Sequence, residues 1–208
     1  MLLELVTMLS PTVSPIYDLG GPSITFRTGC SSSLVGLHEA CQGLYSGECS
    51  SALVAGTNLI FAPTMTTAMS KNMVISESGI CKTFDAAADG YGRGEAVNAI
   101  FIKPLDKALR DGDPVCAVIR SSAVNSDGKT PNITTPGSKA QERLIRRAYR
   151  KARIDKISQT AFFECHGTGT VVGDTSEASV LANIFGKEGI YIGAVSKNPI
   201  PFAGGIIY

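Results

Sequence analysis

The chain has 208 residues, of which 44% are hydrophobic and 18% are charged, and its formal net charge is +1. This length allows a substantial buried core in one domain or in two small ones. A charge so close to neutral gives no extended field for nucleic acid or for an anionic membrane. No apolar run is long enough to cross a bilayer, and the apolar opening stretch lacks the basic flank and cleavage site of a secretory signal.

The cysteines and histidines limit the redox and metal chemistry that we expect. The six cysteines, at positions 30, 41, 49, 81, 116 and 165, include no Cys-x-x-Cys pair and show no regular spacing. The pattern therefore predicts neither a disulfide framework nor a zinc site. Only two histidines are present, His38 and His166. We expect no bound metal and a cytosolic compartment.

Short apolar runs rich in β-branched residues alternate with helical patterns along the chain. A first helix is expected over Leu34–Leu44, with Gly47 as its C-terminal cap. The predicted strands are Ala52–Ala55, Ala96–Ile102, Val115–Val124, Ala161–Phe163 and Ile190–Val195. Most of these runs are continuous, which is typical of strands covered on both faces in a mainly parallel sheet. The alternation indicates an α/β layered fold with helices around a mixed, mainly parallel sheet.

Two further helices are expected in the second half of the chain. One begins at Ser138, where Gln141 three residues later completes a capping-box pattern, and another follows Asp174. The first of them has an apolar face of Ala140, Leu144, Ala148 and Ala152. Its opposite face carries Arg143, Arg146, Arg147, Arg150 and Lys151. This basic face has two interpretations, a solvated helix surface or a docking surface for an acidic carrier protein.

Cys30 is the first candidate for chemistry. It stands in Gly29-Cys30-Ser31-Ser32-Ser33, immediately before the first predicted helix. Unpaired N–H groups and the positive end of the helix dipole favour a thiolate at such a position, which makes the cysteine a better nucleophile. Taken alone, each of the six cysteines is better interpreted as a small buried hydrophobic residue.

His166 is the second candidate. It follows the predicted strand Ala161–Phe163 and precedes the Gly/Thr turn Gly167–Thr170. In open α/β sheets, ligands bind at the carboxyl ends of strands, and the Thr168 and Thr170 hydroxyls could meet a polar substrate there. The alternative is a structural strand-to-helix turn. His38, in the middle of a helix, is interpreted as structural.

Together these stretches resemble the β-ketoacyl synthase (ketosynthase) domain of polyketide synthases over about Ile16 to Asn198. The motifs that carry the resemblance, in chain order, are Asp18–Ser23, Thr28–Leu34, Ser46–Cys49, Cys81–Ala86, Asp89–Glu95, Asn125–Thr130 and His166–Thr170. The run from Ala52 to Ser70 is most similar to fungal reducing type I enzymes. On this basis residues 1–15 stay unassigned, and residues 16–208 are expected to form a partial ketosynthase domain.

The resemblance implies a partial thiolase-like fold and a mechanism. Cys30 would accept an acyl group from the phosphopantetheine thioester of an acyl carrier protein. His166 would be the first of two catalytic histidines that assist the decarboxylation of the malonyl extender and the condensation. Thr168, Thr170, Lys197 and Asn198 would contact substrate. The resemblance implies no directly bound cofactor, because the carrier brings the phosphopantetheine, and it implies a homodimer.

The sequence also departs from the family pattern. The second catalytic histidine is expected in an Asn-x-Gly-His stretch, but this chain has Asn198-Pro199-Ile200-Pro201 there, with proline at the histidine position. Lys197 stands one position later than the family's lysine, and Arg27 replaces an acidic residue. Proline cannot polarise a carbonyl group, so we expect weak condensation. Much of the family's amino-terminal half is also absent, which is expected to impair activity further.

Three other interpretations compete with that of a condensing enzyme. The chain could be a non-catalytic ketosynthase-like scaffold or a carrier-docking fragment, which the basic helix favours. A Cys/His hydrolase is disfavoured because there is no Gly-x-Ser-x-Gly elbow and no tryptophan for a papain-type signature. A dinucleotide site at Gly90–Gly94 fails because its third glycine comes one residue early.

Overall fold

The computed structural model describes residues 4–8, 16, 18–131, 135–186 and 189–197. The chain divides into two compact units. Unit 1 comprises the described residues within Met1–Leu59 and Glu95–Ser122, and unit 2 comprises those within Ile60–Gly94 and Ala123–Pro201. Each unit is described by itself below. No described helix combines the length and the hydropathy needed to span a bilayer.

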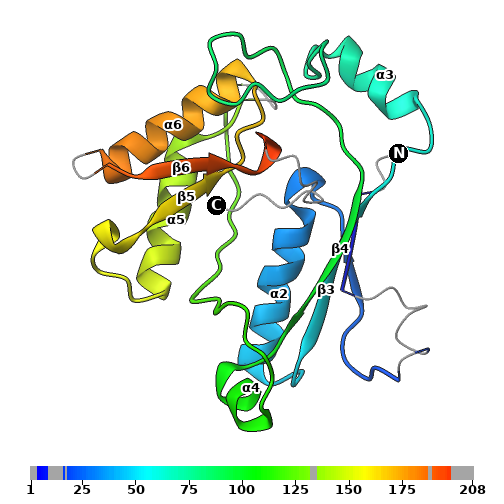
Figure 1. Ribbon diagram of the computed structural model, residues 1–208, viewed down its shortest axis with the longest axis vertical. Helices are drawn as coiled ribbons and strands as arrows, with labels where there is room; N and C mark the ends of the chain where they lie inside the picture. The colour runs from blue at the N-terminus through cyan, green and yellow to red at the C-terminus, as the bar shows by residue number, and fades with distance from the viewer. Residues whose placement is uncertain (1–3, 9–15, 17, 132–134, 187–188, 198–208) are drawn as a thin grey trace. The chain divides into compact units, whose positions relative to one another are not determined.

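Unit 1 is an antiparallel sheet with a helix packed on it. Its strands are β1 (Glu4–Met8), β2 (Ile24–Phe26), β3 (Ala52–Asn58) and β4 (Ala96–Ile102), in the order β2-β1-β3-β4. The central pairing places Ala52 opposite Ile102 and Asn58 opposite Ala96. The helix α2 (Ser32–Ser46) packs against β1, β2 and β3 (Figure 1). A short η1 (Gly29–Ser31) precedes α2, and α4 (Leu105–Asp111) follows β4.

The core of unit 1 is small. Ala40 of α2 meets Val54 of β3, and Leu37, Phe26 and Ile102 pack around them. Gly47 ends α2 with a φ of 80°, so the predicted glycine cap is confirmed. His38 is hydrogen-bonded through Nδ1 to the Ser122 hydroxyl at 2.8 Å, which agrees with its structural interpretation.

Unit 2 contains a two-stranded parallel sheet with two long helices beside it. Its elements are α3 (Thr64–Lys71), α5 (Ser138–Lys151), η2 (Ile157–Gln159), β5 (Phe162–Cys165), α6 (Val171–Phe185), β6 (Tyr191–Ala194) and η3 (Val195–Lys197). The helices α5 and α6 pack on each other beside β5 and β6 (Figure 1). Ile145, Phe163, Val180, Leu181 and Phe185 form the buried core between them. Unit 2 therefore has the larger apolar core of the two.

Three predictions about the fold need correction. Val115–Val124 forms no strand, because its apolar run finds no ladder partner among the described residues. The sheet is not mainly parallel, since three of the four strand pairings are antiparallel. A continuous apolar run does not distinguish the two pairings. The Ser138 capping box is also absent, because Gly137 is the N-cap and the Ser138 hydroxyl lies 2.6 Å from the Ser176 hydroxyl instead.

Candidate active site

Cys30 lies in a turn between a strand and a helix of unit 1. β2 ends at Phe26, and η1, which contains Cys30, leads directly into α2 at Ser32. Gly29 has a φ of 68°, a left-handed conformation that glycine adopts readily. The Cys30 side chain is exposed. The structure therefore places this thiol at the helix start, where the sequence predicted it.

Two serine side chains hold the turn around Cys30. The Ser31 hydroxyl donates to the Thr28 carbonyl oxygen at 2.9 Å. The Ser32 hydroxyl donates to the Gly29 carbonyl oxygen at 2.7 Å and accepts from the Thr28 N–H at 2.8 Å. Ser32 is buried, so its two bonds are partly shielded from water, whereas the Ser31 bond is exposed. The serines that follow the cysteine thus fix the backbone that presents it.

His166 directly follows β5, at the carboxyl end of a parallel strand of unit 2. The turn from His166 to Thr170 leads into α6, and Gly167 and Gly169 have positive φ angles of 51° and 76°. The turn could not accept a larger residue at 169, because a Cβ atom there would lie 2.8 Å from the backbone nitrogen of Lys82. Sequence and structure thus agree on a tight strand-to-helix turn that carries His166.

Two buried carboxylates of α6 hold this turn by its backbone. Glu177 accepts from the N–H groups of His166 at 2.8 Å and Gly167 at 3.0 Å. Asp174 accepts from the Gly169 N–H at 3.1 Å and from the Phe84 N–H at 2.7 Å. Both side chains are at most 5% exposed. Burial raises the pKa of Glu177, although its hydrogen bonds from Gly167 and His166 oppose that shift.

These carboxylates are residues of the candidate site that the sequence analysis missed. Asp174 and Glu177 are the only charged residues within Val171–Phe185, which is otherwise apolar or small. Two acids one turn apart on such a helix are a signal for buried, hydrogen-bonded anions. In the described part of the chain, no group of three or more His, Cys, Asp or Glu side chains could hold a metal ion. The carboxylates instead hold backbone N–H groups.

The His166 ring is held neutral by its surroundings. Burial lowers the pKa of His166 to about 4, while the charge of Asp174 acts in the opposite direction. The ring is therefore uncharged near pH 7, with one nitrogen able to donate a hydrogen bond and the other able to accept one. A neutral imidazole of this kind can polarise a carbonyl oxygen through its N–H.

The remaining predicted site residues are only partly described. Thr168 and Thr170 are half-buried, and their hydroxyl oxygens lie 3.0 Å apart. Lys197 is the last residue of η3, and Asn198 and Pro201 lie outside the described residues. Cys30 belongs to unit 1, whereas His166 and both threonines belong to unit 2.

The cysteine beside the histidine has a different character from Cys30. Cys165 is fully buried in the unit 2 core. Burial, with a smaller contribution from the nearby carboxylates, raises the pKa of its thiol to about 12. A thiol in this state is a packing group and not a nucleophile at neutral pH.

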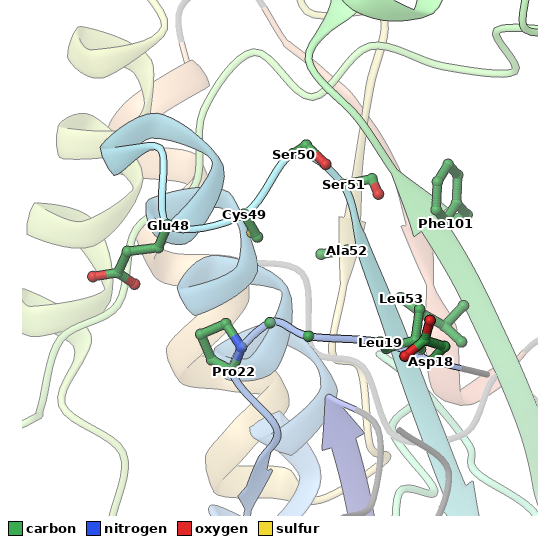
Figure 2. Close-up of a pocket in the computed structure, with 12 residues that line it drawn as sticks. Asp18, Leu19, Pro22, Glu48, Cys49, Ser50, Ser51, Ala52, Leu53 and Phe101 are labelled. Carbon is green, nitrogen blue, oxygen red and sulfur yellow. The ribbon is translucent and has the colours of Figure 1, made fainter. Parts of the chain in front are cut away.

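A pocket of about 370 Å³ lies in unit 1. Figure 2 shows it between the stretch Asp18–Pro22, the stretch Glu48–Leu53 and Phe101. Neither Cys30 nor any residue of the His166 turn lines it. We therefore assign the chemistry from the two turns and not from this pocket.

Two family models match the chain. The β-ketoacyl synthase N-terminal domain matches residues 3–108, and the β-ketoacyl synthase C-terminal domain matches residues 116–199. The first match begins within the segment 1–15 that the sequence analysis left unassigned. The boundary between the matches lies within the unit 1 segment Glu95–Ser122, and the first match also includes the unit 2 segment Ile60–Gly94.

Similar proteins agree with these matches. The highly reducing polyketide synthase VdtX of Byssochlamys spectabilis is 59% identical over 186 residues, which is 89% of this chain and 8% of VdtX. A highly reducing polyketide synthase of a Fusarium species is 54% identical, over 92% of this chain and 8% of its own length. The chain therefore spans less than a tenth of these relatives.

Solved structures show the same similarity in three dimensions. The ketosynthase from module 6 of the bacillaene synthase of Bacillus subtilis superposes with a TM-score of 0.85 at 37% identity. The superposition covers 89% of this chain and 34% of that one. An oxazolomycin ketosynthase domain from Streptomyces albus gives the same TM-score at 36% identity, over 89% of this chain and 33% of its own. The predicted thiolase-like α/β fold is confirmed by these neighbours.

Proposed function

Since the chain belongs to the β-ketoacyl synthase family, we propose that it is the acyl-accepting part of a ketosynthase domain from a fungal reducing polyketide synthase. The observation that carries the proposal is the Cys30 turn, in which Gly29 and two serine hydroxyls present an exposed thiol at the start of α2. We keep residues 16–208 as the partial ketosynthase domain.

The proposed first step is transfer of an acyl group to Cys30. Cys30 gives up its thiol proton, and the thiolate attacks the thioester carbonyl carbon of an acyl carrier protein. The carbon–sulfur bond to phosphopantetheine breaks, and phosphopantetheine leaves as a thiolate that takes up a proton equivalent to the one Cys30 released. This gives an acyl thioester on the Cys30 sulfur. N–H groups at the start of α2 can stabilise the oxyanion of the tetrahedral intermediate. Thr168 and Thr170 are proposed to bind the pantetheine arm, and Lys197 and Asn198 to complete the substrate site.

The proposed second step is decarboxylative condensation. The malonyl group loses its carboxylate as carbon dioxide, and the electron pair of the broken bond forms an enolate. The enolate carbon attacks the acyl carbon on Cys30, a carbon–carbon bond forms, and the sulfur of Cys30 leaves. The neutral His166 ring would stabilise the enolate oxygen by donating a hydrogen bond. Because Pro201 stands where the resemblance expects the second histidine, we expect acyl transfer to exceed condensation.

The proposal extends to the setting of the intact synthase. Its partners would be an acyl carrier protein and its acyl and malonyl thioesters, with phosphopantetheine supplied by the carrier and no cofactor bound directly. The intact domain would act as a homodimer in the cytosol.

Acyl transfer to the purified chain tests the proposal. Incubation with a short acyl phosphopantetheine thioester, followed by peptide mass mapping, should place the acyl group on Cys30 and lose it in Cys30→Ala. Cys116 is also exposed and serves as the internal control for simple accessibility. Cys116→Ala should leave the acyl adduct unchanged. An adduct that survives Cys30→Ala would exclude the proposed nucleophile.

A second candidate function, a carrier-docking fragment without catalysis, is favoured by α5. This helix carries six basic residues and one acidic residue, whereas the whole chain has a net charge of +1. Only Arg146 of its arginines has an ion pair within the described residues, with Glu142 at 2.8 Å. Such a face suits an acidic partner through charge complementarity.

Charge reversal distinguishes this candidate from the first. Arg146, Arg147 and Arg150 are changed together to Glu, and binding to an acidic acyl carrier protein is measured at low salt. Docking predicts loss of binding that does not depend on Cys30. A matched triple reversal at the exposed Arg27, Lys71 and Arg110 should leave binding intact. Equal effects from both triples would mean that only net charge matters.

A further inference from the structure

Thr83 is a buried residue that touches the His166 turn from a distant part of the sequence. Its side chain is 6% exposed, and its hydroxyl donates to the carbonyl oxygen of Gly167, 84 positions later. Both residues belong to unit 2. The sequence resemblance includes Thr83 within Cys81–Ala86 but gives it no role. Its contact with the residue next to His166 raises the question of what the hydroxyl does.

The four backbone polar groups of His166 and Gly167 are all bonded to side chains. Glu177 accepts from both N–H groups, and the Ser196 hydroxyl donates to the His166 carbonyl oxygen at 2.8 Å. The Thr83 hydroxyl donates to the fourth group, the Gly167 carbonyl oxygen. Glu177 and Ser196 follow the turn in sequence, so Thr83 is the one contribution from an earlier segment.

Gly167 is confined sterically as well as by hydrogen bonds. Its φ of 51° is left-handed, and a Cβ atom there would collide with the Thr83 methyl group and with the Ala194 side chain. Thr83 therefore limits Gly167 with its methyl group and bonds it with its hydroxyl. The Gly167 carbonyl group lies in the Gly167–Thr168 peptide. A rotation of that peptide changes the Gly167 backbone torsions, and through them it would move His166, the preceding residue.

The residue after Thr83 is also held against this turn. Phe84 has a φ of 55°, which is unusual for a bulky residue, and its N–H donates to Asp174 at 2.7 Å. The same carboxylate accepts from Gly169 at 3.1 Å. The Gly90 N–H donates to the Gly169 carbonyl oxygen at 2.9 Å. The segment around Thr83 is thus held to α6 and to the turn at further points besides the Thr83 hydroxyl.

We propose that Thr83 is a positioning residue whose hydroxyl, by holding the Gly167 carbonyl group, sets the orientation of the His166 ring. The inference rests on the proposed role of His166 for its meaning in catalysis. The orientation itself can be measured without any turnover. Removing the hydroxyl leaves a buried carbonyl group without its donor, which favours rotation of that peptide or entry of water.

The two histidines make this measurable by NMR. In ¹³C-labelled protein, the ring signals are those of His38 and His166, and His38 lies in unit 1. We expect Thr83→Val to shift the His166 ring signal and to raise its titration midpoint from about 4 toward 6.5 as water reaches the ring. Thr83→Ser keeps the hydroxyl and should restore the parent spectrum. The His38 signal should be unchanged in both variants.

A matched variant separates positioning from general loss of a threonine hydrogen bond. Thr160 lies in the same unit and its hydroxyl is 2.6 Å from the Tyr149 hydroxyl, remote from the turn in the hydrogen-bond network. Thr160→Val should leave the His166 signal and midpoint unchanged. If Thr83→Val does not fold, Thr83→Ala carries the same prediction with less crowding.

Two results would overturn the inference. One is a His166 signal and midpoint in Thr83→Val that match the parent protein. The other is a Thr83→Ser variant that shifts the signal as much as Thr83→Val, since the methyl group would then be the important part. Loss of acylation at Cys30 would sink the proposed function but would not alter either outcome, so the two failures are distinguishable.

Discussion

The Cys30 turn and the His166 turn are built in contrasting ways. Cys30 is exposed, and its turn is held by hydrogen bonds between residues that are three or four positions apart, through the side chains of Ser31 and Ser32. The His166 turn is held by two buried carboxylates and by residues as distant as Thr83. Both present one reactive side chain. They differ in how much of the surrounding fold is needed to hold it.

The apolar cores of the two units also differ. Unit 2 buries Phe163, Val180 and Phe185 beneath the histidine turn. Unit 1 buries mainly Ala40 and Val54, while Val97 and Phe101 of its strand β4 are 72% and 64% exposed. Apolar burial is the main stabilising contribution to folding, so we expect unit 2 to be the more stable unit. The buried Cys165 in unit 2 and Cys41 in unit 1 allow the comparison to be tested by thiol labelling.

Neutralising Glu177 should give the largest effect. Glu177→Gln leaves one oxygen to accept from the N–H groups of His166 and Gly167. Its amide N–H₂ group would face one of these two donors, and no hydrogen bond could form there. Hydrogen bonds to charged groups are worth about 1.5–3 kcal/mol, so we expect a loss of about 3 kcal/mol in the stability of unit 2. Labelling of Cys165 by a thiol reagent under native conditions should accelerate about 100-fold.

The control for this change is another glutamate in the same unit. Glu142 forms an exposed ion pair with Arg146 on α5, and such pairs contribute at most about 1 kcal/mol. Glu142→Gln should therefore leave Cys165 labelling nearly unchanged. If Glu177→Gln accelerates Cys41 labelling as much as that of Cys165, the two units open together and the comparison between them fails.

A glycine pair sharpens the comparison at the level of single contacts. Gly169 and Gly112 have nearly equal φ angles of 76° and 74°, but a Cβ atom at 169 would lie 2.8 Å from a backbone nitrogen, whereas one at 112 meets nothing within 4 Å. Left-handed backbone alone costs a non-glycine residue about 1–2 kcal/mol. Gly169→Ala should therefore lower the free energy of unfolding more than Gly112→Ala, by about 1 kcal/mol or more.

Urea unfolding of both alanine variants provides the measurement. The difference between them isolates the close packing of the His166 turn against Lys82, because the backbone strain is matched. Equal losses at the two glycines would show that the turn can move away from the neighbouring segment, and the description of a rigid histidine turn would then be wrong.

Much of this architecture follows from local sequence patterns. The helix α2 with its Gly47 cap, the strand β4 over Ala96–Ile102 and the helix α5 all lie where periodicity and turn residues predicted them. The strand expected over Val115–Val124 is absent, because strand formation needs a ladder partner that a local run does not specify. Pairing direction was mispredicted for the same reason.

The residues of the candidate site also differ in whether the local sequence could predict them. Cys30 and His166 were placed correctly from their immediate neighbours, a helix start and a strand end. Asp174 and Glu177 had a local signal, two acids on an apolar helix, that was not used. Thr83 had none, because its partner Gly167 lies 84 positions away and nothing near Thr83 indicates which backbone carbonyl group its hydroxyl meets. Contacts of this kind depend on tertiary structure.

The last expected effect is the pH dependence of the stability of unit 2. The pKa of His166 is lowered from 6.5 to about 4 by burial, so the unfolded chain takes up a proton at a higher pH than the folded chain does. Above pH 6.5 the ring is neutral in both states and the histidine contributes no pH dependence. As the pH falls from 6.5 toward 4, the histidine lowers stability by at most about 1.4 kcal/mol per pH unit.

Glu177 also makes the stability of unit 2 depend on pH, but its contribution changes with pH in the direction opposite to that of His166. Its raised pKa means that the folded state holds a proton more tightly than the unfolded state, so its contribution to stability is largest below the unfolded pKa of 4.5 and is lost as the pH rises through the folded pKa.

The pH dependence that His166 gives to stability between pH 6.5 and 5 should therefore be measured both in the parent protein and in Glu177→Gln. Urea unfolding of unit 2, followed by Cys165 protection, should show a fall in stability toward pH 5 in both proteins. His166→Gln should abolish that fall, and His38→Gln in unit 1 should not. A fall of the same size in His166→Gln would mean that another group causes it and that the folded chain does not lower the pKa of His166.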